Sequence, residues 1–180
     1  MAKATDFAPA EVQAFGTLRP VALALGDNVR SASVTALNQV LTDTIALRDL
    51  YKKHHWQVSG PTFHQLHLLF DKHAGEQAEL IDDIAERVMA LGGVAIAASW
   101  DVAETTGLVR PPKGREAPPD QLRRLLTAHE AVLAGARELA RQAADNGDDG
   151  TNDLLVSQVV RTNEAQSWMV AEHLSGLGEA

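Results

Sequence analysis

Apolar residues recur every three or four positions along most of the chain, and this spacing predicts amphipathic α-helices. Glycine and proline interrupt the pattern at Ser59-Gly60-Pro61 and again at Gly92-Gly93, where helices are expected to end. A polar turn at 146–150 separates the last two periodic stretches. Four long helices are therefore predicted, over about residues 33–58, 62–91, 120–144 and 151–174.

The segment between the second and third predicted helices, residues 93–119, is long and rich in proline. Its four prolines, Pro111, Pro112, Pro118 and Pro119, exclude a long helix, and Ile96 to Val102 are expected to form one short helix. A connection of this length can carry the chain from one end of a bundle to the other. Four long helices with one such crossover predict an all-α, ferritin-like four-helix bundle.

Residues 1–30 lack this periodicity and are expected to form a polar N-terminal arm, with a short helix from Ala10 interrupted near Pro20. The 180 residues are enough for one domain with a substantial core and not for two. The domain is therefore predicted to span 1–180, with the four-helix bundle at 33–174.

Composition supports this interpretation, since 45% of the residues are hydrophobic but only 4% are aromatic, a balance that favours packed helices. The chain contains no cysteine, so a metal would be held by nitrogen and oxygen, which suits iron, manganese or zinc. Its formal net charge of −8 repels polyanions and attracts cations. No apolar leader and no membrane-spanning apolar run are visible, so the expected location is cytoplasmic, with nucleoid association as an alternative.

The second predicted helix carries polar residues on an arc that is separate from its apolar stripe. At 100° per residue, the apolar stripe faces the bundle core, and the polar arc spans roughly 100° centred well over 100° from it. Two small residues, Gly75 and Ala78, lie on the polar arc and would let another helix approach closely. The polar residues of the arc are His67, Asp71, Asp82 and Glu86.

These four residues form two pairs with i, i+4 spacing, so each pair can share one metal ion. Eleven residues separate Asp71 from Asp82, which is roughly 16 Å of helix. Metal–ligand bonds are only about 2 Å long, so one chain cannot bring both pairs to one ion. An antiparallel two-fold copy of the helix would place each pair opposite the other and create two identical sites.

His55, late in the first helix, is expected to fold back towards this site as a fifth ligand, and Trp56 would wall it. Charged i, i+4 pairs are common on solvated helix faces, so either pair alone would be weak support for a metal site. Two pairs on one arc, flanking small residues and preceded by His-Trp, favour the metal interpretation.

The same segment resembles the signature of the Dps family, the mini-ferritins, and the resemblance extends from about residue 35 to 174. It is carried by His55-Trp56, Gly60, Phe63, His67, Phe70-Asp71, Asp82, Ala85-Glu86-Arg87 and Leu91-Gly92-Gly93. The resemblance implies inter-subunit ferroxidase ligands at His55, His67 and Asp71 of one subunit and Asp82 and Glu86 of its partner. No ligand of the set is substituted.

Membership would further imply a hollow homo-dodecamer built from two-fold dimers, which oxidises Fe(II) preferentially with hydrogen peroxide, stores the ferric mineral and protects against oxidative damage. Zinc fits the same donors and stays a competitor. Classical ferritins hold iron inside one bundle with Glu-x-x-His motifs. None of the seven histidines here has Glu three residues before it, so an intra-bundle site is not expected.

The remaining candidates are weaker, because the resemblance assigns them no ligand role. His54 and His64 are expected to make surface hydrogen bonds. His73, His129 and His173 are expected to be surface or packing residues, and Trp100 and Trp168 to lie in the core or at an interface.

A second acidic cluster lies around the turn before the last helix, at Asp145, Asp148, Asp149 and Asp153. Acids at a helix N-terminus favour the dipole, which would by itself explain Asp149 and Asp153. The family resemblance instead implies that Asp149, Asp153 and, after a one-residue shortening of the turn, Asp145 line a three-fold pore for Fe(II) entry.

Two further classes of function compete with iron oxidation. A DNA-compacting protein would need basic tails, but residues 1–18 hold only Lys3 against Asp6 and Glu11, and no base follows Arg161. DNA binding is therefore expected to be weak or absent. A structural assembly that holds zinc without redox turnover is the other alternative, and the sequence leaves it open.

Overall fold

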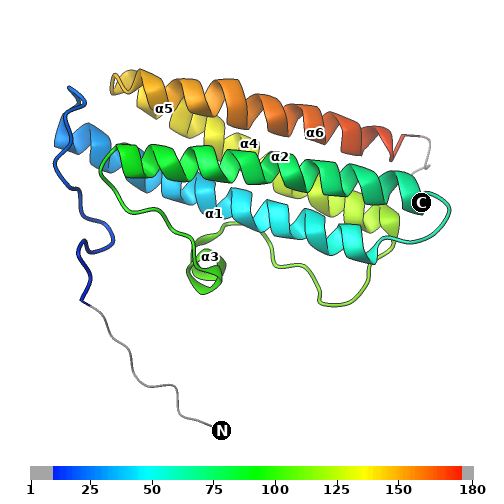
Figure 1. Ribbon diagram of the computed structural model, residues 1–180. Coiled ribbons are helices and arrows are strands. Elements are labelled where there is room, and N and C mark those ends of the chain that lie inside the picture. Colours follow the sequence, from blue (N-terminus) through cyan, green and yellow to red (C-terminus); the bar gives the residue numbers. More distant parts are fainter. Residues whose placement is uncertain (1–9, 176–180) are drawn as a thin grey trace, which may run out of the picture.

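The computed structural model describes residues 10–175, which fold into a bundle of four long helical segments (Figure 1). No β-strand occurs in this part of the chain, so the all-α prediction is confirmed. The last segment is one continuous helix whose middle turns are π-helical. The elements are α1 (Asp27–Gln57), α2 (Phe63–Ala90), α3 (Ser99–Thr105), α4 (Pro118–Asp145), α5 (Asp149–Asp153), η1 (Leu154–Val160) and α6 (Arg161–Glu172).

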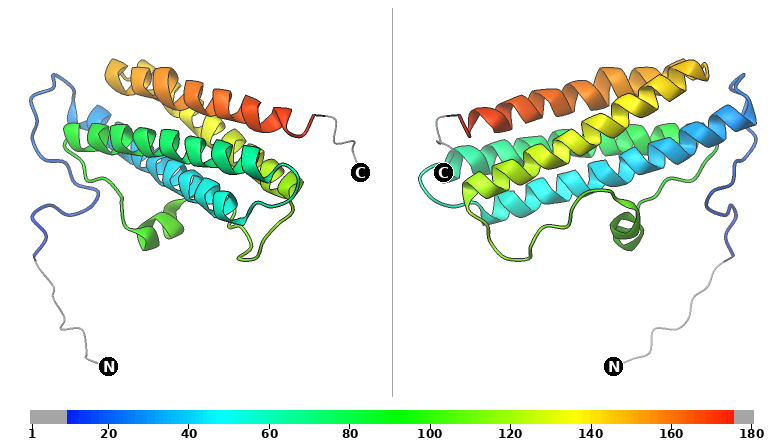
Figure 2. Two further views of the ribbon diagram at one scale, coloured as in Figure 1. Left: turned by 45° about the vertical axis from the view of Figure 1, so that its right-hand side comes forward. Right: turned by 180° about the vertical axis from the view of Figure 1, so that it is seen from behind.

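The connections determine the directions of the helices. A short turn makes α1 and α2 an antiparallel pair, and the crossover, which contains α3, passes along the outside of α1 to the far end of the bundle (Figures 1 and 2). As a result α4 runs in the same direction as α2, as expected from the long connection. Helix α4 packs against α1 and against the last helical segment.

The core is built from the apolar stripes of all four segments, and its largest members are almost completely buried. No helix among residues 10–175 is long and apolar enough to cross a membrane. The fully buried core side chains include Leu37, Leu41, Leu47, Tyr51, Leu66, Phe70, Ile84, Leu91, Leu122, Leu125 and Leu155.

The N-terminal arm differs from its prediction in two ways. No helix forms between residues 10 and 26, and α1 begins at Asp27 instead of residue 33. The arm is tied to the end of α2, since both Arg19 N and the Gln13 amide donate to Gly92 O at 2.9 Å. The early turn of α1 is anchored by the buried Arg30, whose guanidinium donates to Leu91 O at 2.8 Å.

Gly92 and Gly93 end α2 for steric reasons. Gly92 has φ = +87°, and a Cβ there would lie 2.6 Å from Arg19 O. At Gly93 a Cβ would meet Val34 Cγ1 at 2.6 Å. Larger residues would therefore push both the arm and α1 away from the end of α2.

The crossover helix α3 lies three residues later than predicted, because Asn38 holds the preceding segment extended. Its amide donates to Val94 O at 3.0 Å and its Oδ1 accepts from Ile96 N at 2.9 Å. The exclusion of Pro118 and Pro119 from the next helix was wrong, since both lie in the first turn of α4. Proline is tolerated there because the first helical N–H groups have no acceptor within the helix.

Candidate metal centre

The corner between α1 and α2 brings two predicted ligands into contact. Gly60, at φ = +96°, helps to reverse the chain between the helices. The rings of His55 and His67 stack with 3.8 Å between centroids and 21° between planes. Phe63 covers the other side of His67, with ring centroids 5.1 Å apart.

Each of these histidines is oriented by the backbone of the other. His55 Nδ1 lies 2.8 Å from His67 O, and His67 Nδ1 lies 2.9 Å from His55 O. A carbonyl oxygen only accepts hydrogen bonds, so both Nδ1 atoms carry the proton and donate it. In the neutral rings both Nε2 lone pairs are then free, the state that a metal ligand requires.

Asp71 lies next to this histidine pair but is already paired with a lysine. His55 Nε2 is 3.9 Å from Asp71 Oδ1, and Lys52 Nζ is 2.6 Å from the same oxygen. The hydrogen bond from Lys52 is the main reason that the pKa of Asp71 is lowered. A cation that binds Asp71 Oδ1 would compete with the Lys52 ammonium group.

Asp82 and Glu86 lie further along α2, on the same arc as His67 and Asp71. Both are exposed, and neither forms an ion pair with any residue from 10 to 175. Gly75 and Ala78, between the two pairs, are also exposed. The prediction that this arc points away from the bundle core is therefore confirmed.

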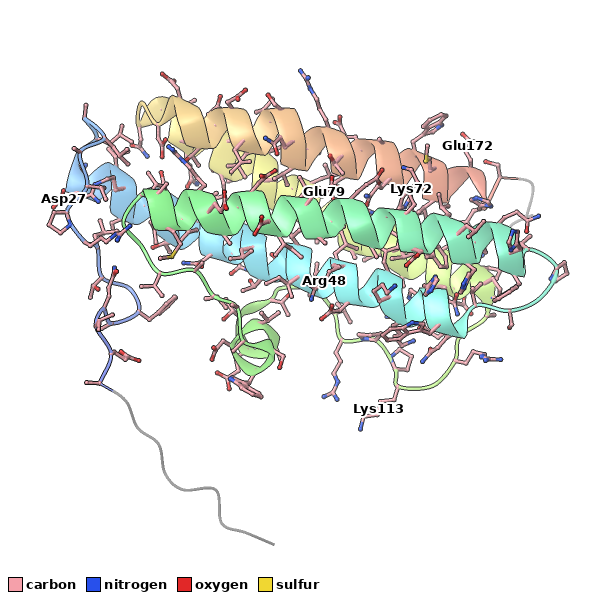
Figure 3. The ribbon with its side chains drawn as sticks, in the orientation of Figure 1. Asp27, Arg48, Lys72, Glu79, Lys113 and Glu172 are labelled. Atoms are coloured by element: carbon pink, nitrogen blue, oxygen red, sulfur yellow. The ribbon has the colours of Figure 1, made fainter. Side chains whose placement is uncertain are left out.

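The neighbouring arc of α2 has a different environment. Lys72 and Glu79 project from the edge of α2 that faces the last helical segment (Figure 3). Together with Asp83 they line an open groove of about 470 Å³ between α2 and that segment. The arc of Asp82 and Glu86 is thus the one that stays without a helix beside it in the single chain.

Trp56, predicted to wall the site, is 70% exposed on α1. The ammonium group of Lys52 lies 5.8 Å from the centre of its ring, within range of a cation–π interaction. Lys52 had not been selected from the sequence. Its spacing from Trp56, i to i+4 on α1, is the only signal that could have indicated it.

The predicted ligands therefore divide into two groups. His55, His67 and Asp71 come together, whereas Asp82 and Glu86 stay apart from them. Among residues 10–175 no three histidine, aspartate or glutamate side chains are arranged to hold a metal ion.

The second acidic cluster, around the turn before the last helical segment, contains both exposed and buried aspartates. Asp145, Asp149 and Asp153 are exposed, whereas Asp148 is 1% exposed and caps α5 by accepting from Thr151 N at 3.1 Å. Arg87 Nη2 lies 2.5 Å from Asp148 Oδ1. Burial alone would raise the pKa of Asp148, but hydrogen bonds from neighbouring groups and the Arg87 charge outweigh burial and lower it.

The other histidines and tryptophans partly differ from expectation. His54 was expected at the surface, but it is fully buried, and neither ring nitrogen has a hydrogen-bond partner among residues 10–175. It faces the core side of α1, against Phe70. Trp100 and Trp168 are 73% and 62% exposed, so neither is a core residue of this chain.

His73 and His129 are fully buried and belong to a hydrogen-bonded network at the centre of the bundle, which the sequence had not indicated. A usable signal existed, since His73 and Gln77 fall on the apolar stripe of α2. No glutamate is buried among residues 10–175.

Comparisons with known proteins identify the family of this fold. The family model of the ferritin-like domain matches residues 34–179. A "Nutrient stress-induced DNA-binding protein" of Synechococcus is 32% identical over 164 residues, 91% of this chain and 93% of the relative. The solved structure of DpsC from Streptomyces coelicolor is 54% identical, with a TM-score of 0.92, over 95% of this chain and 99% of that one. This chain belongs to the Dps family.

A more distant family member has the same fold. The crystal structure of an archaeal Dps homologue from Halobacterium salinarum is 25% identical and has a TM-score of 0.89, over 93% of each chain. The α1–α2 pair, the α3-containing crossover and the last two long segments are therefore the Dps arrangement of the ferritin-like fold.

Proposed function

We propose that this Dps-family chain is a subunit of an iron-storage and detoxification protein whose ferroxidase sites lie between subunits. The observation that carries the proposal is the half-site at the α1–α2 corner. There His55 and His67 keep both Nε2 atoms free beside Asp71. Asp82 and Glu86 of a second subunit would complete a set of nitrogen and oxygen donors that suits iron.

The proposed dimer is two-fold and antiparallel along α2. The offset of eleven residues between the pairs is then bridged by the partner helix, and the two sites are equivalent. Exposed Gly75 supports a close approach of the partner's α2 helix. Gly75 has no side chain, and the space where a Cβ would lie is open, with no atom of this chain within 4 Å. Trp56 and Phe63 would shield the site from bulk water.

The substrate is Fe(II), and the proposed oxidant is hydrogen peroxide. Two Fe(II) ions give one electron each, the peroxide O–O bond breaks, and two protons from solvent complete two water molecules. Two-electron reduction avoids the release of hydroxyl radical. Asp71 becomes available to the substrate when Lys52 moves away, and Lys52 is 34% exposed and free to turn towards solvent.

The proposed assembly is a hollow shell of twelve subunits that stores the ferric product. Asp145, Asp149 and Asp153 are the proposed lining of its iron-entry pore, and their exposure supports this role. Asp148 is not part of the proposed lining, because Arg87 neutralises it.

Subunit mixing tests whether the site lies between subunits. One inactive variant lacks the first pair (His67→Ala with Asp71→Ala), and the other lacks the second pair (Asp82→Ala with Glu86→Ala). In a mixed two-fold dimer one site loses all four side chains and the other keeps them all. With random pairing, about a quarter of the wild-type sites should therefore be restored.

The measurement is ferric absorbance after Fe(II) is added without oxygen and peroxide follows, on variants unfolded together and reassembled. No recovery in the mixture would contradict an inter-subunit site. Wild-type oxidation no faster than the protein-free reaction would reject ferroxidase activity and favour the zinc-holding alternative.

We further propose that this chain does not bind DNA tightly, in contrast to what the name of the Synechococcus relative says of that protein. A formal charge of −8 per subunit, repeated in an assembly, repels the phosphate backbone. A gel shift at about 0.15 M salt should show no complex without added divalent metal. A stable complex under those conditions would overturn the proposal.

A further inference from the structure

Six polar side chains meet at the centre of the bundle. They come from α1, α2, α4 and α6, and each is no more than 1% exposed. Buried polar groups are costly unless hydrogen-bonded, and in this cluster only His73 Nε2 and Gln77 Oε1 lack a partner among residues 10–175. Its members are Tyr51, His73, Gln77, His129, Asn163 and Gln166.

The hydrogen bonds of this network have one consistent direction. Asn163 Nδ2 donates to Val159 O at 2.7 Å, so Asn163 Oδ1 is the acceptor that faces His129 Nδ1 at 2.9 Å. His129 therefore carries its proton on Nδ1, and its Nε2 has a free lone pair. The Tyr51 hydroxyl donates to that Nε2 at 2.5 Å.

The remaining bonds support the same assignment. The hydroxyl oxygen of Tyr51 accepts from His73 Nδ1 at 3.1 Å. Gln77 Nε2 donates to Asn163 Oδ1 at 3.1 Å and to Gln166 Oε1 at 2.9 Å. Tyr51 is thus held between a donor, His73, and a base, His129.

The protonation states agree with this direction. Burial lowers the pKa of His129 to about 4, so the ring is neutral at physiological pH and can accept a proton. Burial, followed by the charge of Glu76, raises the pKa of the Tyr51 hydroxyl well above its ordinary value. Tyr51 is therefore held as the neutral phenol, with its proton directed at His129 Nε2.

The phenol is also close to the proposed iron site. Tyr51 and His55 are four residues apart on α1, one helical turn or about 6 Å along the axis. The Tyr51 ring lies 6.0 Å, centroid to centroid, from the ring of Phe70, which precedes Asp71. The three tryptophans, by contrast, are exposed and have no histidine base as hydrogen-bond partner among residues 10–175.

We propose that Tyr51 supplies the second electron to peroxide when a single Fe(II) occupies the site, while His129 Nε2 takes the phenolic proton. The inference rests on the proposed ferroxidase function. Fe(II) and Tyr51 lose one electron each, the O–O bond of hydrogen peroxide breaks, and two solvent protons complete two waters. The products are Fe(III), a neutral tyrosyl radical and a His129 imidazolium.

This reaction prevents the damaging alternative at a half-loaded site. A lone Fe(II) can give peroxide only one electron, which leaves hydroxide and a hydroxyl radical. Oxidised phenol is a far stronger acid than imidazolium, so transfer of the proton to His129 is downhill. The buried radical is then separated from solvent until another Fe(II) arrives to reduce it.

The test uses the fact that Tyr51 is the only tyrosine in the chain. The assembled protein, loaded with one Fe(II) per site without oxygen, is mixed with peroxide, frozen rapidly and examined by electron paramagnetic resonance. A radical signal that narrows in protein grown with ring-deuterated tyrosine is expected. Ferric absorbance without any tyrosine-derived signal would overturn the inference and leave the ferroxidase function standing.

Variants separate the redox role from a structural one. His129→Gln keeps a hydrogen-bond acceptor but not a base, and should lower the tyrosyl yield by about tenfold or more. Tyr51→Phe should abolish the signal and raise the yield of spin-trapped hydroxyl radical. Trp168→Phe, which removes an exposed aromatic residue, is the matched control and should change neither readout.

Two outcomes would reject the assignment independently of variant stability. A wild-type radical that is unaffected by tyrosine deuteration would assign the electron to tryptophan. A wild-type tyrosyl yield in folded His129→Gln would show that His129 is not the proton acceptor. Absence of ferric product in the wild-type protein would overturn the ferroxidase function and this inference together.

Discussion

Two histidine-containing regions of this molecule lie one helical turn apart and are built in opposite ways. At the α1–α2 corner, His55 and His67 use one nitrogen each for a backbone bond and leave the other free. At the bundle centre, His129 uses both nitrogens for hydrogen bonds within the protein. The first region has unpaired ring nitrogens beside Asp71, whereas the second is enclosed by its own chain.

The comparison shows that residue type alone does not indicate a metal ligand. What matters is whether the lone pair is free and whether carboxylates can reach it. The corner has a free pair of Nε2 atoms beside Asp71, and the bundle centre has amides in place of carboxylates. Four predictions, from the largest expected effect to the smallest, test this contrast.

The largest effect is expected at the open region. Asp82→Ala should slow peroxide-driven Fe(II) oxidation by more than about 100-fold, because loss of groups that merely support metal ligands already costs 10–100-fold. Stopped-flow ferric absorbance measures the rate, and circular dichroism should show unchanged helices. Asp83→Ala, one residue along and on the groove side of α2, is the control and should keep the rate. Wild-type kinetics in Asp82→Ala would refute the ligand assignment.

The enclosed region should make the protein sensitive to mild acid. Burial lowers the pKa values of His54, His73 and His129 from 6.5 to about 4. Between these pH values the unfolded chain binds more protons than the folded one, so stability is complete above pH 6.5 and is lost as the pH falls towards 4. Each histidine can contribute up to about 3 kcal/mol, to be measured by denaturant unfolding at several pH values.

The variant His54→Leu tests whether His54 contributes to this acid effect. His54 has no hydrogen-bond partner in the described chain, so leucine should weaken the pH dependence and also stabilise the protein at pH 7 by about 1–3 kcal/mol. Destabilisation at pH 7 would mean that the His54 ring makes a favourable interaction. An unchanged pH dependence would show that His54 is not one of the titrating groups.

A polar-to-apolar change within the network should be costly. Asn163→Leu removes the acceptor of His129 Nδ1 and one of the two acceptors of Gln77 Nε2, so one N–H group of each side chain is left buried and unpaired. A loss of about 2–4 kcal/mol in the free energy of unfolding is expected. Asp82→Asn, at an exposed position of α2, should change stability by less than about 0.5 kcal/mol. Equal effects of the two changes would remove the contrast between the regions.

The smallest effect is expected at Lys52. Lys52→Met removes the ammonium group that occupies Asp71 and should tighten Fe(II) binding by about fivefold, the size of an exposed ion pair. Anaerobic titration measures the affinity. Arg48→Met, which removes a half-buried cation of α1 paired with Asp49, serves as the control. Weaker binding in Lys52→Met would indicate that Lys52 assists the site.

Much of the fold followed from the periodicity of apolar residues, because the four long helices each bury a wide apolar stripe. Boundaries that depend on distant contacts did not follow. The start of α1 at Asp27 relies on Arg30 bonding to the end of α2, and the position of α3 relies on Asn38. The π-helical turns at Leu154–Val160 have no local signal in the sequence.

The sequence by itself determined which donors are present and how far apart they lie on α2, since spacing along a helix follows from its constant rise. The assignment of Asp82 and Glu86 to a partner's site stays a prediction. Only the tertiary structure decided which histidines are enclosed, which nitrogen of each ring carries the proton, and that Arg87 neutralises Asp148. Those properties depend on contacts between residues that are remote in sequence, and helical periodicity contains no information about them.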